Sequence, residues 1–146
     1  MALDFETGFL VGQTVTITLM FLGVAMIVSV INSFLIRFSA NIVMKFKPAY
    51  VMSYTAAFLG LVATSTVAVF VDHFFNPVEK PISIPGAIFA GWCILYLVSG
   101  IYGYILKSPE KFPIGQQNGS AVLLLQLLLT GVISLPFIAV SILVAD

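Results

Sequence analysis

The chain has 146 residues, of which 60% are hydrophobic and 8% are charged, and its six Lys and Arg balance its six Asp and Glu. A soluble domain usually carries about 25% charged residues, so the composition excludes one. A formal net charge of zero also excludes a nucleic-acid-binding protein with a basic face and an acidic disordered tail. The sequence therefore predicts an integral membrane protein.

Four uncharged intervals separate the charged residues, and each is longer than the ~20 residues that cross the hydrocarbon core of a bilayer. We expect transmembrane helices at about 9–36, 50–72, 85–106 and 121–144. They would form a single all-α domain over residues 1–146, a four-transmembrane-helix bundle. The polar segment 113–119 (PIGQQNG) is predicted to be a loop. Segments of alternating hydrophobicity, which would indicate a β-barrel, are absent from the sequence.

The first helix begins with an acidic segment, MALDFETGF, which differs from the basic start of a cleaved signal peptide. We expect this helix to persist in the mature protein. Beyond its apolar part, residues 37–47 (RFSANIVMKFK) are predicted to continue as a short basic helix at the membrane interface. Arg37, Lys45 and Lys47 are candidate contacts for anionic lipid headgroups. The alternative is that these three cations only set the topology of the chain.

Small residues recur along one face of the second helix and one face of the third. The second helix carries Ala56, Gly60, Thr64 and Ala68, and the third carries Ala87, Gly91, Ser99 and Gly103. Helices associate in lipid where small residues let their backbones approach. We therefore expect these two faces to pack closely against each other.

Two amides interrupt otherwise apolar helices, Asn32 in the first and Gln126 in the fourth. At a rise of 1.5 Å per residue, both lie roughly 8 to 9 Å inside the same membrane boundary. Because an unpaired amide in hydrocarbon is costly, we predict a polar clamp between the first and fourth helices. The alternative is a water or solute path, which Thr130 and Ser134 would extend along the fourth helix. Pro136 is predicted to bend that helix.

The loops after the first and third helices hold five of the six basic residues. By the positive-inside rule these loops face the cytoplasm and both termini face away from it. The expected location is the inner (plasma) membrane of a bacterium.

The chain has one His and one Cys, too few for a tetrahedral metal site. No His, Asp, Glu or Lys lies in the interior of a predicted membrane span, so a nucleophile there would have no base. The sequence predicts no catalytic, metal-binding or cofactor-binding residue, and no enzyme. His73, at the outer end of the second helix, is the one candidate for an axial ligand to a haem or pigment.

The sequence favours a non-enzymatic structural or accessory subunit of a membrane assembly, or a self-assembling homo-oligomer. Its partners would be the lipid bilayer and other membrane subunits or copies of itself, and not nucleic acid. The alternative is a small pore, channel or transporter subunit lined by hydroxyl and amide side chains.

Overall fold

A computed structural model describes residues 2–75 and 84–145. They form four helices, α1 (Ala2–Met44), α2 (Tyr50–Phe75), α3 (Ile84–Ile105) and α4 (Gly115–Ala145). Each contains a segment long and apolar enough to cross a membrane, which confirms the predicted all-α chain with four candidate spans. An isolated bridge between Lys107 and Pro113 is the one strand-like pairing within the described residues.

Three helix ends differ clearly from the expected ones. α1 begins at Ala2, well before the predicted start at about residue 9. α1 ends at Met44, so the predicted basic helix over residues 37–47 stops three residues early. α4 begins at Gly115, inside the segment that was predicted to be a loop. Gly115 has a φ of 80°, a left-handed conformation that glycine adopts without strain. The turn into α4 is therefore completed at Gly115, and the polar residues that follow it are helical.

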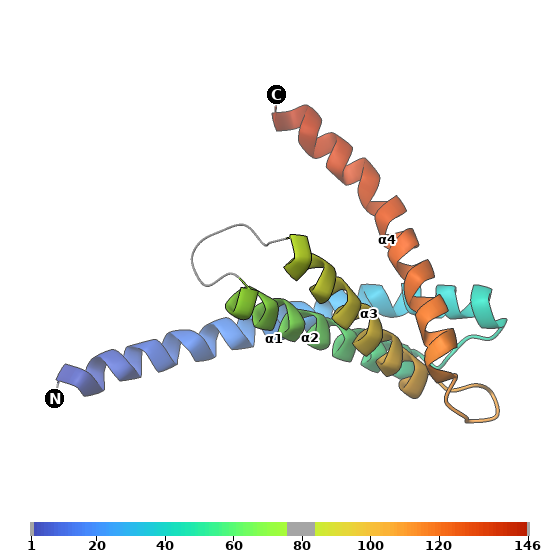
Figure 1. The fold of residues 1–146 in the computed structure, drawn as a ribbon, viewed down its shortest axis with the longest axis horizontal. Helices are drawn as coiled ribbons and strands as arrows, with labels where there is room; N and C mark the ends of the chain where they lie inside the picture. The colour runs from blue at the N-terminus through green and yellow to red at the C-terminus, as the bar shows by residue number, and fades with distance from the viewer. Residues whose placement is uncertain (1, 76–83, 146) are drawn as a thin grey trace.

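Neighbouring helices along the chain pack against each other, and α1 also contacts α4. Among the described residues, α1 does not contact α3 and α2 does not contact α4. The four helices thus form a bundle in which each has two neighbours. In Figure 1, α1 and α2 run side by side, whereas α4 leans away so that its C-terminus lies far from the N-terminus of α1.

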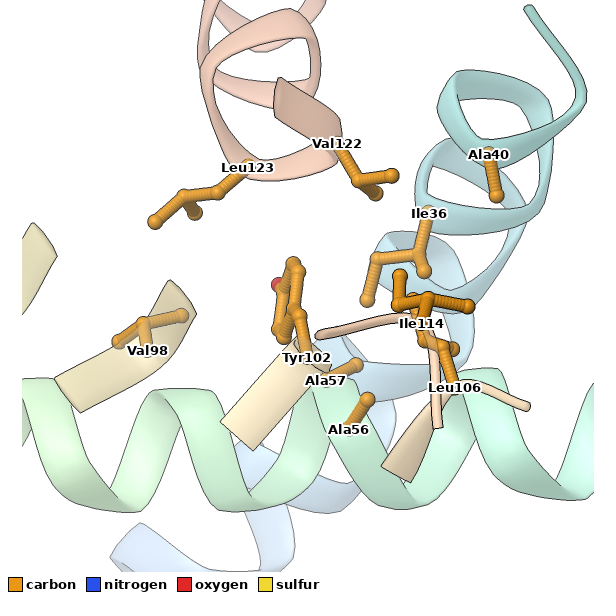
Figure 2. Close-up of a cluster of buried hydrophobic side chains, with 10 residues drawn as sticks. All are labelled: Ile36, Ala40, Ala56, Ala57, Val98, Tyr102, Leu106, Ile114, Val122 and Leu123. Carbon is orange, nitrogen blue, oxygen red and sulfur yellow. The ribbon is translucent and has the colours of Figure 1, made fainter. Parts of the chain in front are cut away.

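The buried core lies at the end of the bundle that carries the two basic loops. Tyr102 lies at its centre, between α2 on one side and α4 on the other (Figure 2). The hydrophobic core cluster consists of Ile36, Ala40, Ala56, Ala57, Val98, Tyr102, Leu106, Ile114, Val122 and Leu123. We call the surrounding segments, residues 29–61 and 98–126, the packed end.

The remaining described parts of the helices, residues 15–28, 62–75, 84–97 and 127–145, form what we call the splayed end. Most of its described side chains are exposed, and Ala25, Val71 and Gly86 are the buried ones among them. The exposed side chains are mainly apolar, as expected for surfaces that face lipid or other membrane helices. The core therefore occupies one end of the bundle instead of its full length.

Candidate functional site

The backbones of α3 and α4 approach closely where glycines of the two helices face each other. A Cβ atom added to Gly103 would lie 2.6 Å from the carbonyl oxygen of Gly115, and one added to Gly119 would lie 2.6 Å from the nitrogen of Gly103. Gly103 pairs with Ser99 at four-residue spacing, and Gly115 pairs with Gly119 in the same way. Two motifs of small residues therefore face each other across this interface. We predicted Ser99 and Gly103 to face α2, but they face α4.

The small residues of α2 meet α3 at the packed end. A Cβ atom at Gly60 would lie 3.3 Å from Cγ1 of Val98 and 3.4 Å from Cε1 of Tyr102. Ala56, one turn earlier, is fully buried. Thr64, one turn later, is half-buried and its hydroxyl donates a hydrogen bond to the carbonyl oxygen of Gly60, at 2.8 Å. Ala56 and Gly60 therefore lie in a close contact between helices.

In the splayed end, the predicted small residues of α2 and α3 do not form a close backbone contact. Ala68 and Ala87 are exposed. A Cβ atom at Gly91 would meet no atom within 4 Å, so the backbone of α3 is not closely approached there. The two small-residue faces thus pack over part of the expected length.

A cavity of about 250 Å³ lies at the junction of the two ends, and all four helices contribute to its lining. Its polar lining residues are Asn32, Thr64, Tyr102, Gln126 and Thr130. The other lining residues are apolar side chains and Gly60. The structure therefore brings Asn32 and Gln126 to one cavity, together with Tyr102, which was not predicted to contact them.

Gln126 forms a side-chain hydrogen bond with a residue of α3. The hydroxyl of Tyr102 donates a hydrogen bond to Oε1 of Gln126, at 2.7 Å, and both side chains are buried. The half-buried Asn32 lines the same cavity, but no hydrogen bond joins it to Gln126 among the described residues. The predicted polar contact on Gln126 is thus present with a different partner, and it links α3 to α4 instead of α1 to α4.

A sequence signal for Tyr102 exists but is weak. A buried tyrosine hydroxyl needs an acceptor, and Gln126 supplies one on the next helix. The chain has five tyrosines, however, and Tyr96 and Tyr104 on the same helix are exposed. Nothing in the sequence distinguishes Tyr102 from these two.

The hydroxyls that follow Gln126 bond to their own helix. Thr130 donates to the carbonyl oxygen of Gln126 and Ser134 donates to that of Gly131, both at 2.9 Å. Thr130 lines the cavity, whereas Ser134 does not. Along α4, the polar lining therefore ends at Thr130.

The predicted lipid-contacting cations separate into two environments. Arg37 and Lys47 line a second hollow of about 310 Å³ on the surface of α1, together with Phe34, Phe38 and Asn41. Lys45 is exposed and does not line this hollow. The three cations therefore do not form one continuous stripe on a helix.

Within the described residues, no cluster of three or more His, Cys, Asp or Glu is arranged to hold a metal ion. His73 is exposed near the end of α2, where its ring meets that of Phe74 edge-on with centroids 5.4 Å apart. Cys93 is a free, half-buried thiol on α3. Comparison with protein families, curated proteins and solved structures finds no match to this chain.

Proposed function

We propose that the chain is a non-enzymatic subunit of a membrane assembly, in which the splayed end receives a helix of another membrane protein or of a second copy. The observation that carries this proposal is the divergence of α1 and α4 beyond the packed end (Figure 1). Ile17 and Leu19 on α1, and Leu135 and Ile138 on α4, are all more than half exposed. A helix seated against these side chains would supply the packing that associates helices in lipid.

A solute-conducting subunit is the second candidate function, because Asn32 and Gln126 line one cavity. Two features weigh against it. The side-chain oxygen of Gln126 already accepts a hydrogen bond from Tyr102. The hydroxyls of Thr130 and Ser134 donate hydrogen bonds to backbone oxygens of α4. These groups offer fewer free hydrogen-bonding atoms to a passing solute than the sequence alone suggests.

Photo-cross-linking in the native membrane tests the assembly proposal. A benzophenone amino acid at Ile17 or Ile138 should form adducts with a protein, since both positions lie on the splayed end. The matched control is Val51, which is 72% exposed but lies at the packed end. We expect lipid adducts alone from Val51. Lipid adducts alone from all three positions, with a monomeric protein in native nanodiscs, would contradict the proposal.

A liposome flux assay tests the second candidate. If the chain conducts a solute, Asn32→Leu should alter flux while leaving thermal stability in detergent unchanged, because Asn32 makes no hydrogen bond to Gln126. The control is Ser134→Ala, which lies outside the cavity. Equal flux through wild type, both variants and protein-free liposomes would leave the assembly proposal as the sole candidate.

We also propose that the packed end faces the cytoplasm, in the inner membrane of a bacterium. Arg37 lies in the last part of α1, Lys45 and Lys47 follow that helix, and Lys107 and Lys111 lie between α3 and α4. Both loops are at the same end of the bundle (Figure 1). Positively charged short loops are retained in the cytoplasm. Lys80 and Asp146, expected on the opposite side, lie outside the described residues.

Cysteine labelling in intact cells tests this orientation. In a Cys93→Ser background, single cysteines at Lys47 and Lys111 should be protected from an impermeant thiol reagent, and one at Asp4 should react. Lysed cells should label at all three positions, which controls for accessibility. Labelling at 47 and 111 but not at 4 in intact cells would show the opposite orientation.

A further inference from the structure

The surface hollow on α1 combines cations with aromatic side chains. Arg37, Asn41 and Lys47 line it together with Phe34 and Phe38, and its volume is about 310 Å³. Phe34 lies about 4.5 Å deeper than Arg37 along α1, at a rise of 1.5 Å per residue. The hollow therefore has a charged part near the end of α1 and an apolar part nearer the middle of the helix.

The turn after α1 creates this arrangement. Lys45 has a φ of 57°, and its backbone N–H donates to the carbonyl oxygen of Asn41 at 3.1 Å. A left-handed residue with this bond is a common way to end a helix. The chain then reverses, Pro48 is buried, and α2 begins at Tyr50. After this turn Lys47 lines the hollow together with Arg37, whereas Lys45 does not line it.

The first residue of α2, Tyr50, lies close to Arg37. The guanidinium carbon lies 6.0 Å from the centroid of the Tyr50 ring, at the outer limit of a cation–π contact. The same ring lies 5.5 Å from that of Phe34. Nε of Arg37 is buried and has no hydrogen-bond partner. Because Nε is enclosed, an anion would have to reach the outer guanidinium nitrogens through the hollow that Arg37 lines.

The charge of the hollow is not neutralised by the protein. Within the part of the chain that the structure describes, no carboxylate pairs with Arg37 or Lys47. Asp72 lies near the far end of α2, and Glu110 lies in the loop between α3 and α4. Two cations and an amide therefore share one concave site without an acidic partner.

We propose that this hollow binds an anionic glycerophospholipid, with its phosphate between Arg37 and Lys47. The Asn41 amide contacts the headgroup, and an acyl chain follows the apolar part of the hollow. The exposed residues Ile27 and Ile31 continue the face of Phe34 and Phe38 towards the middle of the helix. Charge-assisted hydrogen bonds from a guanidinium to phosphate oxygens are among the stronger ones in proteins. This inference is independent of the proposed assembly.

A comparison of Lys45 with Lys47 distinguishes binding at a specific site from general attraction to a charged membrane. A basic residue near an anionic surface attracts it whether or not it lines a site. Lys45 and Lys47 are two residues apart in the same turn and carry the same charge. Non-specific attraction therefore treats them alike, whereas the hollow includes Lys47 alone.

The test measures lipid bound to the detergent-solubilised full chain by native mass spectrometry, with dioleoyl phosphatidylglycerol as the probe and phosphatidylcholine as the neutral comparison. We expect phosphatidylglycerol binding to fall about tenfold in Lys47→Gln and less than about twofold in Lys45→Gln. Arg37→Gln should lose at least as much as Lys47→Gln. Equal losses in the two lysine variants, or equal binding of the two lipids by wild type, would overturn the proposal.

A competition experiment distinguishes a lipid from a soluble anion. Inorganic phosphate at millimolar concentration should leave phosphatidylglycerol bound, because the ion lacks the chain that contacts Phe34 and Phe38. Displacement of the lipid by phosphate alone would show a site for a free anion and overturn the lipid assignment. Thermal unfolding of each variant in detergent identifies any that fails to fold, and the lysine pair, which lies in a turn, then decides the outcome.

Discussion

Glycines of α3 and α4 have different surroundings at the two ends of the bundle. At the packed end, a Cβ atom on Gly103 or Gly119 would collide with backbone atoms of the neighbouring helix. At the splayed end, a Cβ atom on Gly91 or Gly131 would meet nothing within 4 Å. These four glycines lie on the same two helices. A glycine in a membrane helix therefore contributes to association only where a second backbone lies opposite it, and the stability of the isolated chain should come mainly from the packed end.

The largest effect should come from Gly119→Ala, compared with Gly131→Ala on the same helix. The added Cβ would lie 2.6 Å from the nitrogen of Gly103, and a backbone atom cannot move aside unless the helices separate. We expect a loss of about 3 kcal/mol in the free energy of unfolding for Gly119→Ala. Gly131→Ala should change it by less than about 0.5 kcal/mol. Steric trapping in mild detergent measures both, and wild-type stability for Gly119→Ala would contradict the close contact.

The next effect concerns side-chain packing at each end. Leu106 has no exposed surface, whereas Leu128 is 67% exposed. Truncating Leu106 to Ala leaves a cavity among the core residues and should cost about 2 kcal/mol. Leu128→Ala should cost less than about 0.5 kcal/mol in the isolated chain. Equal losses from the two substitutions, measured by unfolding in detergent, would show that both ends are packed alike.

A smaller effect is expected from the hydrogen bond between Tyr102 and Gln126. A double-mutant cycle with Tyr102→Phe and Gln126→Leu should give a coupling of about 1 kcal/mol, since each single change leaves the other polar group unpaired. A second cycle with Asn32→Leu and Gln126→Leu should be additive, because no hydrogen bond joins those two side chains. Coupling in the second cycle alone would restore the clamp predicted between α1 and α4.

The smallest effect on stability should come from Pro136→Ala. Pro136 lies inside α4 in the exposed splayed end, where it removes a backbone hydrogen bond to Val132. We expect the free energy of unfolding to change by less than about 0.5 kcal/mol. Because a proline inside a helix is expected to bend it, the distance between spin labels at Ile17 and Ile138 should change when Pro136 is replaced. A stability change above about 1 kcal/mol would mean that this part of α4 has packing partners in the isolated chain.

The number and approximate position of the helices follow from the sequence, because uncharged intervals of this length have few other solutions in a membrane chain. The position at which α4 begins does not follow from the sequence in this way. The segment after Pro113 contains two glycines and three amides, which are typical of loops in soluble proteins. Gly115 and Gly119 also form a small-residue pair at four-residue spacing, the pattern that marks close helix contacts in membranes. The loop interpretation was wrong because it applied soluble-protein preferences to a membrane helix.

The partners of individual residues could be predicted only in part. The sequence predicts that the amide of Gln126 forms a hydrogen bond inside the apolar bundle, and it does form one. Its partner is Tyr102 because α3 and α4 come together at Gly103 and Gly119, and sequence spacing does not specify which helix faces which. In the same way, the pattern of Arg37, Lys45 and Lys47 predicted a short basic helix over residues 37–47. α1 instead ends at Met44, Lys45 is left-handed, and Arg37 and Lys47 line one hollow that Lys45 does not reach.

The length of α1 matters for the thickness of the surrounding bilayer. Its 43 residues extend about 65 Å as one continuous helix, roughly twice the hydrocarbon thickness of a typical membrane. Its candidate membrane span, Val15–Met44, has 30 residues and extends about 45 Å, so a typical bilayer accommodates it only if the helix tilts, projects beyond the lipid or thickens the bilayer locally. The contacts at the packed end hold the C-terminal part of α1, so we expect mismatch to be absorbed nearer its N-terminus. The separation of α1 from α4 should therefore depend on bilayer thickness, and lipids of different chain length provide a way to vary it.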